Sequence, residues 1–151
     1  MSSGSNRGFW AVILPIAAAG ALLVVLIVLN RPTGGPAEGS SATESNLRSA
    51  LAAAKTLAAR DGSYEAATPL AVGSSEPSLV FIWGDEASND PGVISVSFTP
   101  TLWVGSARYS SGTCYWVRDD LGGGTTFGTS TDCAADRLRT ATGSANGWPS
   151  R

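Results

Sequence analysis

The sequence has no histidine, one lysine and two cysteines among its 151 residues. Without histidine, a Ser-His-Asp triad, a Cys-His pair and the commonest zinc ligand are all excluded. Catalysis would then depend on carboxylates or lysine alone, so we expect no enzymatic activity, no catalytic residue, no cofactor, no metal and no small-molecule substrate.

Charge is also sparse. Ten basic residues stand against twelve acidic ones; without Arg7 and Arg31, eight basic and twelve acidic residues remain, a net charge of −4. Phosphate backbones are bound by clustered lysine and arginine, which this composition does not provide. The sequence therefore predicts no nucleic-acid partner.

One long uncharged stretch is present, at residues 9–29. As a helix rising 1.5 Å per residue it would span roughly 30 Å, the thickness of a bilayer's hydrocarbon core. A cleaved signal peptide is the alternative, but its apolar stretch is typically only about 7–15 residues and is followed by small residues. Here the small residues 17–21 lie inside the run, which favours a transmembrane anchor with the lipid bilayer as its partner.

The orientation of this anchor is predicted from its flanks and from the cysteines. Arg7 and Arg31 nearly cancel, and the amino terminus favours a cytoplasmic tail at residues 1–8. Cys114 and Cys133 lack histidine partners for a metal site, so a disulfide is favoured over two unrelated buried thiols. Such a bond persists outside the cytosol, which places the carboxy-terminal domain extracytoplasmically in a single-pass protein of the cell membrane.

The rest of the chain predicts an α+β domain. Residues 30–40 are rich in proline and glycine and form a flexible linker. Ser41 and Glu44 then make a capping box, and a helix ends at Asp61-Gly62. Its apolar stripe is Leu47, Ala50, Leu51, Ala54, Leu57 and Ala58.

Four β-branched and aromatic segments follow, at residues 78–83, 93–98, 101–109 and 113–118. Their short connections predict an antiparallel meander of about four strands against the helix. We expect a head at residues 41–142 and a loose tail at 143–151, which includes Trp148. Trp83, Trp103 and Trp116 should pack in or on the sheet.

Three polar motifs are candidate sites. The loop with Asp85, Glu86, Asn89, Asp90 and Gly92 has calcium-ligand types, but its spacing favours a solvated turn. Asp119 and Asp120 could form a glycosidase pair, but adjacent residues at a strand end point apart, and the family resemblance described below implies that they are turn residues. Gly122–Gly124 has no lysine and helix after it, so it is a hairpin loop rather than a phosphate cradle.

Two stretches resemble bacterial type IV pilin-like or pseudopilin-like proteins, over about residues 45–140. Asn46 to Lys55 with Asp61 to Tyr64 resembles their amphipathic helix and the turn after it. Residues 111–119, 124–128 and Cys133 resemble their globular head, where a disulfide often closes the carboxy-terminal loop.

This resemblance implies a processing junction between Gly8 and Phe9, with two departures. The fifth position from Phe9 is Ile13 instead of the family's glutamate, and the linker separates the anchor from the second helix. These differences favour a minor or divergent subunit that meets other pilin-like subunits. The alternative is an anchored extracytoplasmic binding or sensor domain that joins no filament.

Overall fold

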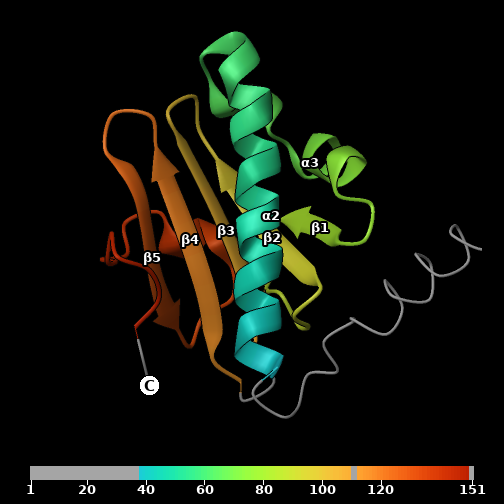
Figure 1. Cartoon of the computed structure of the whole chain (residues 1–151), viewed down its shortest axis with the longest axis vertical. Coiled ribbons are helices and arrows are strands. Elements are labelled where there is room, and N and C mark those ends of the chain that lie inside the picture. The colour runs from blue at the N-terminus through green and yellow to red at the C-terminus, as the bar shows by residue number, and fades with distance from the viewer. Residues whose placement is uncertain (1–37, 110–111, 150–151) are drawn as a thin grey trace, which may run out of the picture. The chain divides into compact units, whose positions relative to one another are not determined.

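The computed structural model describes residues 38–109 and 112–149, which lie in the compact unit formed by residues 36–151. Its two α-helices cover one face of a five-stranded sheet with strand order β1-β2-β3-β4-β5 (Figure 1). The elements in chain order are α2 (Glu38–Asp61), η1 (Tyr64–Ala66), α3 (Pro69–Ser75), β1 (Val80–Trp83), β2 (Val93–Phe98), β3 (Leu102–Arg108), β4 (Cys114–Asp120), β5 (Gly124–Ser130) and η2 (Ala135–Leu138). The predicted α+β class is confirmed.

Helix α2 lies on the sheet through small and apolar side chains. Its buried residues are Leu47, Ala50, Leu51, Ala53, Ala54 and Ala58. They include the predicted stripe except Leu57, which is only partly buried. The helix begins at Glu38 instead of Ser41, so residues 38–40 belong to it and the predicted capping box is not its start. Its end at Asp61 agrees with the prediction, and Gly62 there takes a positive φ of 68°.

The sheet contains the four predicted strands and two features that were predicted wrongly. Strand β5 was missed, and β1 pairs with β2 in parallel, in the register Phe81 with Ile94. A parallel pair requires the chain to return across the sheet. Residues 84–92 make this return over the face opposite α2, where Ser88 N–H donates to the Cys133 carbonyl at 3.1 Å. The sheet is therefore mixed.

Helix α3 was not predicted, although its start is encoded locally. Thr68 is its N-cap and accepts a hydrogen bond from Ala71 N–H at 3.2 Å, and Pro69 occupies its first turn. Both residue types favour these positions. The helix packs beside β1, where a Cβ atom at Gly73 would lie 3.3 Å from the Phe81 ring. It therefore extends the helical layer to the β1 edge of the sheet.

The two faces of the sheet each bury one large indole. Trp103 lies on the α2 face over Gly105, and Trp116 lies on the opposite face over Gly128 and Gly143. Both rings are almost completely buried, at 0% and 1% exposure. Trp83 instead lies on the sheet with 54% of its surface exposed. The glycines are needed because no Cβ fits beneath these rings.

The carboxy-terminal residues pack against the domain, which corrects the prediction of a loose tail over residues 143–149. Phe127 and Ser144 exchange two backbone hydrogen bonds of 2.8 and 2.9 Å. The Trp148 indole N–H donates to the Trp116 carbonyl at 2.9 Å, and its ring lies 4.6 Å from that of Phe127. The Arg48 guanidinium stacks over both aromatic rings at about 5 Å.

In the part of the chain that the structure describes, no helix has the length and hydropathy to cross a membrane. The predicted anchor at Phe9–Leu29, the Gly8-Phe9 junction and residues 30–37 of the predicted linker lie outside the described residues.

Replacing Gly128 with alanine should lower the free energy of unfolding by about 1–3 kcal/mol, because the new methyl group would overlap the Trp116 ring. Urea unfolding followed by tryptophan fluorescence measures this change. Gly92→Ala is the matched control, since its nearest contact, Asp90 Oδ1 at 3.4 Å, is an ordinary one. Equal stability of the two variants would contradict the proposed packing of Trp116.

Candidate functional site

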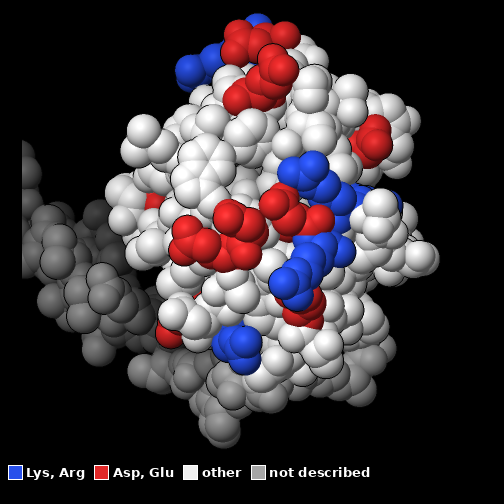
Figure 2. All heavy atoms as spheres, turned by 180° about the vertical axis from the view of Figure 1, so that it is seen from behind, with Lys and Arg blue, Asp and Glu red and all other residues white. Residues whose placement is uncertain are grey.

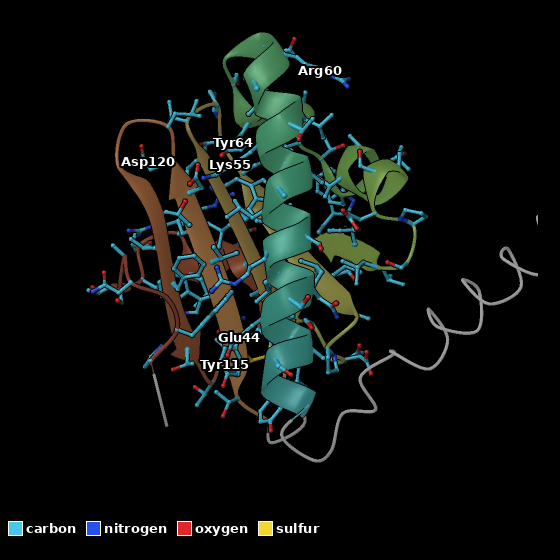
Figure 3. The ribbon with its side chains drawn as sticks, viewed as in Figure 1. Glu44, Lys55, Arg60, Tyr64, Tyr115 and Asp120 are labelled. Carbon is cyan, nitrogen blue, oxygen red and sulfur yellow. A yellow bond between two sulfur atoms is a disulfide. The ribbon has the colours of Figure 1, made fainter. Side chains whose placement is uncertain are left out.

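A buried carboxylate joins α2, η1 and the β4–β5 hairpin. Asp119 accepts hydrogen bonds from the Tyr64 hydroxyl at 2.5 Å and from the Thr125 hydroxyl, and its Oδ1 lies 2.8 Å from Lys55 Nζ. Lys55 also donates to Thr125 Oγ1 at 2.9 Å. Figure 3 shows Lys55 and Tyr64 converging beside the hairpin, with Asp120 at its turn. Helix end and hairpin are thus tied through one side chain.

The protonation states in this cluster follow from its geometry. Burial raises the pKa of Asp119, but hydrogen bonds from Lys55, Thr125 and Tyr64 outweigh burial and hold the pKa below its usual value. Burial and the hydrogen bond to Asp119 raise the pKa of Tyr64 above its usual value. Asp119 is therefore ionised and Tyr64 neutral at pH 7. A ligand that bound to this carboxylate would compete with the three donors that it already accepts.

Asp119 and Asp120 point to different surroundings, as predicted, but Asp119 is not a turn residue. Asp119 is 4% exposed within β4, whereas the exposed Asp120 accepts hydrogen bonds from the backbone N–H groups of Gly122 and Gly123. Its role is to fix the hairpin turn that the three glycines form. Both residues line one pocket of about 420 Å³. The Asp119 carboxylate is nevertheless buried and bonded to Lys55 and Tyr64, and Asp120 is engaged by the turn, so the two carboxylates lack the free acid and base that a glycosidase needs.

The face opposite α2 carries the disulfide that was predicted. Cys114 and Cys133 are bonded, with their Cα atoms 5.3 Å apart. The segment after Cys133 is held by serines on the sheet: Ser106 Oγ donates to the Cys133 carbonyl at 2.6 Å, and Ala135 N–H donates to Ser95 Oγ at 3.1 Å. These two serines are fully buried, and their hydroxyls find partners in backbone groups.

A mixed charge patch covers the same face (Figure 2). Arg139 pairs with Asp136 at 2.8 Å and donates to Ser97 Oγ at 2.6 Å, and Ser97 donates to Asp136 at 2.6 Å. Arg137 pairs with Asp132 at 2.9 Å. These groups satisfy one another, so the patch holds η2 on the sheet and presents no excess of one sign.

The acidic loop after β1 is solvated. Asp85, Glu86, Asn89 and Asp90 are all exposed, and the Asp90 carboxylate accepts a hydrogen bond from Gly92 N–H at 2.8 Å. Within residues 38–109 and 112–149 no three His, Cys, Asp or Glu side chains gather in a group that could hold a metal ion.

The remaining candidate is an apolar groove between α3 and β1, which we call the β1 groove. It has a volume of about 440 Å³ and is lined by Pro69, Leu70, Gly73, Ser74, Leu79, Phe81 and Trp83. Leu70 and Trp83 are 82% and 54% exposed. Solvent contact of large apolar side chains costs free energy that a protein partner would recover. The sequence reading missed this groove because α3 was not predicted, although Thr68-Pro69 signals its start.

Comparisons with protein-family models, with curated proteins and with solved structures found no match for this chain.

Asp119→Asn should lower the free energy of unfolding at pH 7 by about 1–3 kcal/mol, because Lys55 and Tyr64 lose a charged acceptor; the partial exposure of Lys55 limits the loss. The folded pKa of Asp119 lies below its unfolded value of about 3.9, so its contribution is present above that pH and is lost as pH falls through the folded pKa. The stability difference between wild type and variant should therefore shrink below about pH 4.

Urea titrations of both proteins across this pH range measure the difference. The control is Asp120→Asn, at an exposed carboxylate whose turn hydrogen bonds an amide oxygen can also accept. A stability difference between wild type and Asp119→Asn that stays constant with pH would show that Asp119 is not the ionised acceptor.

Removing the disulfide by joint Cys114→Ser and Cys133→Ser substitution should cost about 3 kcal/mol of stability by the loop-entropy model. Wild type in reductant should lose a similar amount, and reductant should leave the double variant unchanged. Thiol alkylation with mass spectrometry checks the premise: both cysteines resist the reagent until reductant is added. Modification of both cysteines without reductant would refute the bond.

Proposed function

We propose that this chain is a membrane-anchored, pilin-like structural or assembly subunit of the minor pilin or pseudopilin type, with an extracytoplasmic head. The observation that carries the proposal is the placement of α2. This 24-residue helix starts soon after the uncharged stretch of residues 9–29 and lies along a sheet whose opposite face bears a disulfide-closed carboxy-terminal loop. That is the arrangement the sequence resemblance implies.

Two further features support an assembly role over catalysis. In the described part of the chain the buried carboxylate Asp119 already accepts from three donors, and the charge patch around Asp136 and Arg139 is internally paired. The β1 groove, by contrast, exposes apolar surface. Recognition through exposed apolar surface suits contacts between proteins. The disulfide supports an oxidising compartment outside the cytosol.

A second candidate function is an anchored extracytoplasmic binding domain that joins no filament. The β1 groove favours it as well, because a groove of this size could serve a partner without assembly. The two functions differ in how the amino terminus is treated. A pilin-like subunit is cut before Phe9, whereas a permanent tether keeps residues 1–8.

The protein expressed from the complete sequence should sediment with its native membrane after alkaline washing. Its intact mass should show that residues 1–8 have been removed. Gly8→Val should abolish cleavage, because it changes the residue at the junction. Gly4→Val is the matched control and should leave cleavage unchanged. A membrane-bound protein with residues 1–8 intact would reject the pilin-like assignment in favour of the anchored binding domain. Release by alkaline washing would reject the anchor itself.

A further inference from the structure

Of the four large hydrophobic side chains that the described domain exposes, two belong to strand β1 and a third lies beside it on α3. Leu70, Val80 and Trp83 are 82%, 58% and 54% exposed, and the fourth, Leu121, lies at the β4–β5 turn. Leu70 and Trp83 line the β1 groove on the α2 side of the sheet. Val80 alternates with Phe81 along the strand and so lies on the other side. Apolar surface is thus available on both faces of this one strand.

Strand β1 is also an edge of the sheet. It is the first strand in the sheet order, and among residues 38–109 and 112–149 it pairs with β2 alone. Val80 N–H donates to the Gly92 carbonyl at 2.9 Å, so the backbone groups of Val80 point toward β2. In a parallel ladder the next residue points the other way, which turns the N–H and C=O of Phe81 outward. These groups can receive an added strand, as in β-strand addition.

The surroundings of this edge carry an excess of negative charge. Two arginines lie near it, but Arg139, which lines a pocket with Trp83 and Asp85, is paired with Asp136, and Arg108 is hydrogen-bonded to the Ser88 carbonyl. Between Arg60 and Arg108 the chain has no lysine or arginine, and its six acidic residues are Asp61, Glu65, Glu76, Asp85, Glu86 and Asp90. Glu76 precedes β1, and Asp85 and Glu86 follow it, so carboxylates flank the strand at both ends. A ligand of this edge should therefore carry positive charge on either side of its apolar part.

We propose that the β1 edge binds an extended segment of another polypeptide, apolar at its centre and basic at its ends. The segment hydrogen-bonds to the backbone of Phe81 and places side chains in the β1 groove and over Val80. Its lysine or arginine residues meet Glu76 on one side and Asp85 and Glu86 on the other. This inference rests on the proposed function, because the bound polypeptide is the class of partner with which the head assembles.

Two other occupants fit the edge less well. A second copy paired through β1 in antiparallel fashion would bring Glu76 of each copy toward Asp85 and Glu86 of the other, which like-charge repulsion disfavours. An anionic lipid surface would meet the same acidic residues. The charges therefore select a basic polypeptide over either one.

The test uses the full chain in phosphatidylcholine nanodiscs and a fluorescein-labelled probe peptide, Lys-Lys-Val-Thr-Val-Thr-Val-Lys-Lys. Fluorescence anisotropy should show saturable binding that weakens as salt is raised. The same peptide with glutamate in place of each lysine should bind at least about tenfold more weakly. N-methylation of alternate backbone amides should cost a similar factor, because it removes the donors to the strand. Empty nanodiscs provide the background.

Trp83→Ala should weaken binding of the lysine peptide by about tenfold or more, since it removes one wall of the groove. Leu121→Ala is the matched control, an exposed apolar residue on another element, and should change affinity less than about twofold. Circular dichroism of both variants verifies that the fold is kept; if Trp83→Ala is unfolded, Leu70→Ser replaces it with the same expected loss.

No saturable binding of the lysine peptide would overturn the proposal, as would equal binding of its N-methylated form or an unchanged affinity of a folded groove variant. Self-association that Trp83→Ala abolishes would overturn it in favour of a second copy. The outcome is separable from that of the proposed function. A chain cut before Phe9 that binds no peptide rejects this inference alone, and an uncut chain that binds the peptide at β1 rejects the pilin-like assignment alone.

Discussion

The hydrogen-bonded carboxylate of Asp119 fixes how the helical layer sits on the sheet. The inner face of α2 is mostly alanine, so the helix can lie close to the strands but has little shape to set its position along them. Asp119 supplies that position, because it binds Lys55 near the end of α2 and Tyr64 in η1. From η1 the chain leads into α3, and α3 forms one side of the β1 groove. The groove beside β1 thus depends on a carboxylate of β4, on the same face but three strands away.

The opposite face is held by a different kind of interaction. The disulfide and the buried serines of β2 and β3 secure the segment after Cys133, and this segment in turn holds residues 84–92 through the Cys133 carbonyl and Asp136. Because residues 84–92 cross that face, β2 runs parallel to β1, and β1 stays at the edge of the sheet. A covalent bond between β4 and the carboxy-terminal loop therefore helps to keep a strand edge open at the far side of the sheet.

Residue patterns within short segments predicted helix α2 and strands β1 to β4, because these elements are determined mainly by their own residues. The alanine and leucine spacing gave the inner face of α2, and the four aromatic, β-branched segments gave β1 to β4. Strand β5 was missed because Gly124 and Gly128 weaken its strand pattern, and Gly128 is there to admit the Trp116 ring from β4. The parallel pairing of β1 was missed because contacts with Cys133, distant in sequence, direct the loop before β2. Of the candidate sites, only the disulfide was encoded by residue type alone.

The contrast between the polar clusters and the β1 groove indicates where this domain meets other molecules. Asp119, Ser95, Ser106 and Asp136 are all bonded within the domain, so binding a ligand there would first break existing bonds. The groove has the opposite energetics: covering Leu70 and Trp83 gains free energy, and an added strand pairs backbone groups of Phe81 that the sheet leaves open. The acidic residues around it then favour basic partners over copies of the same acidic edge.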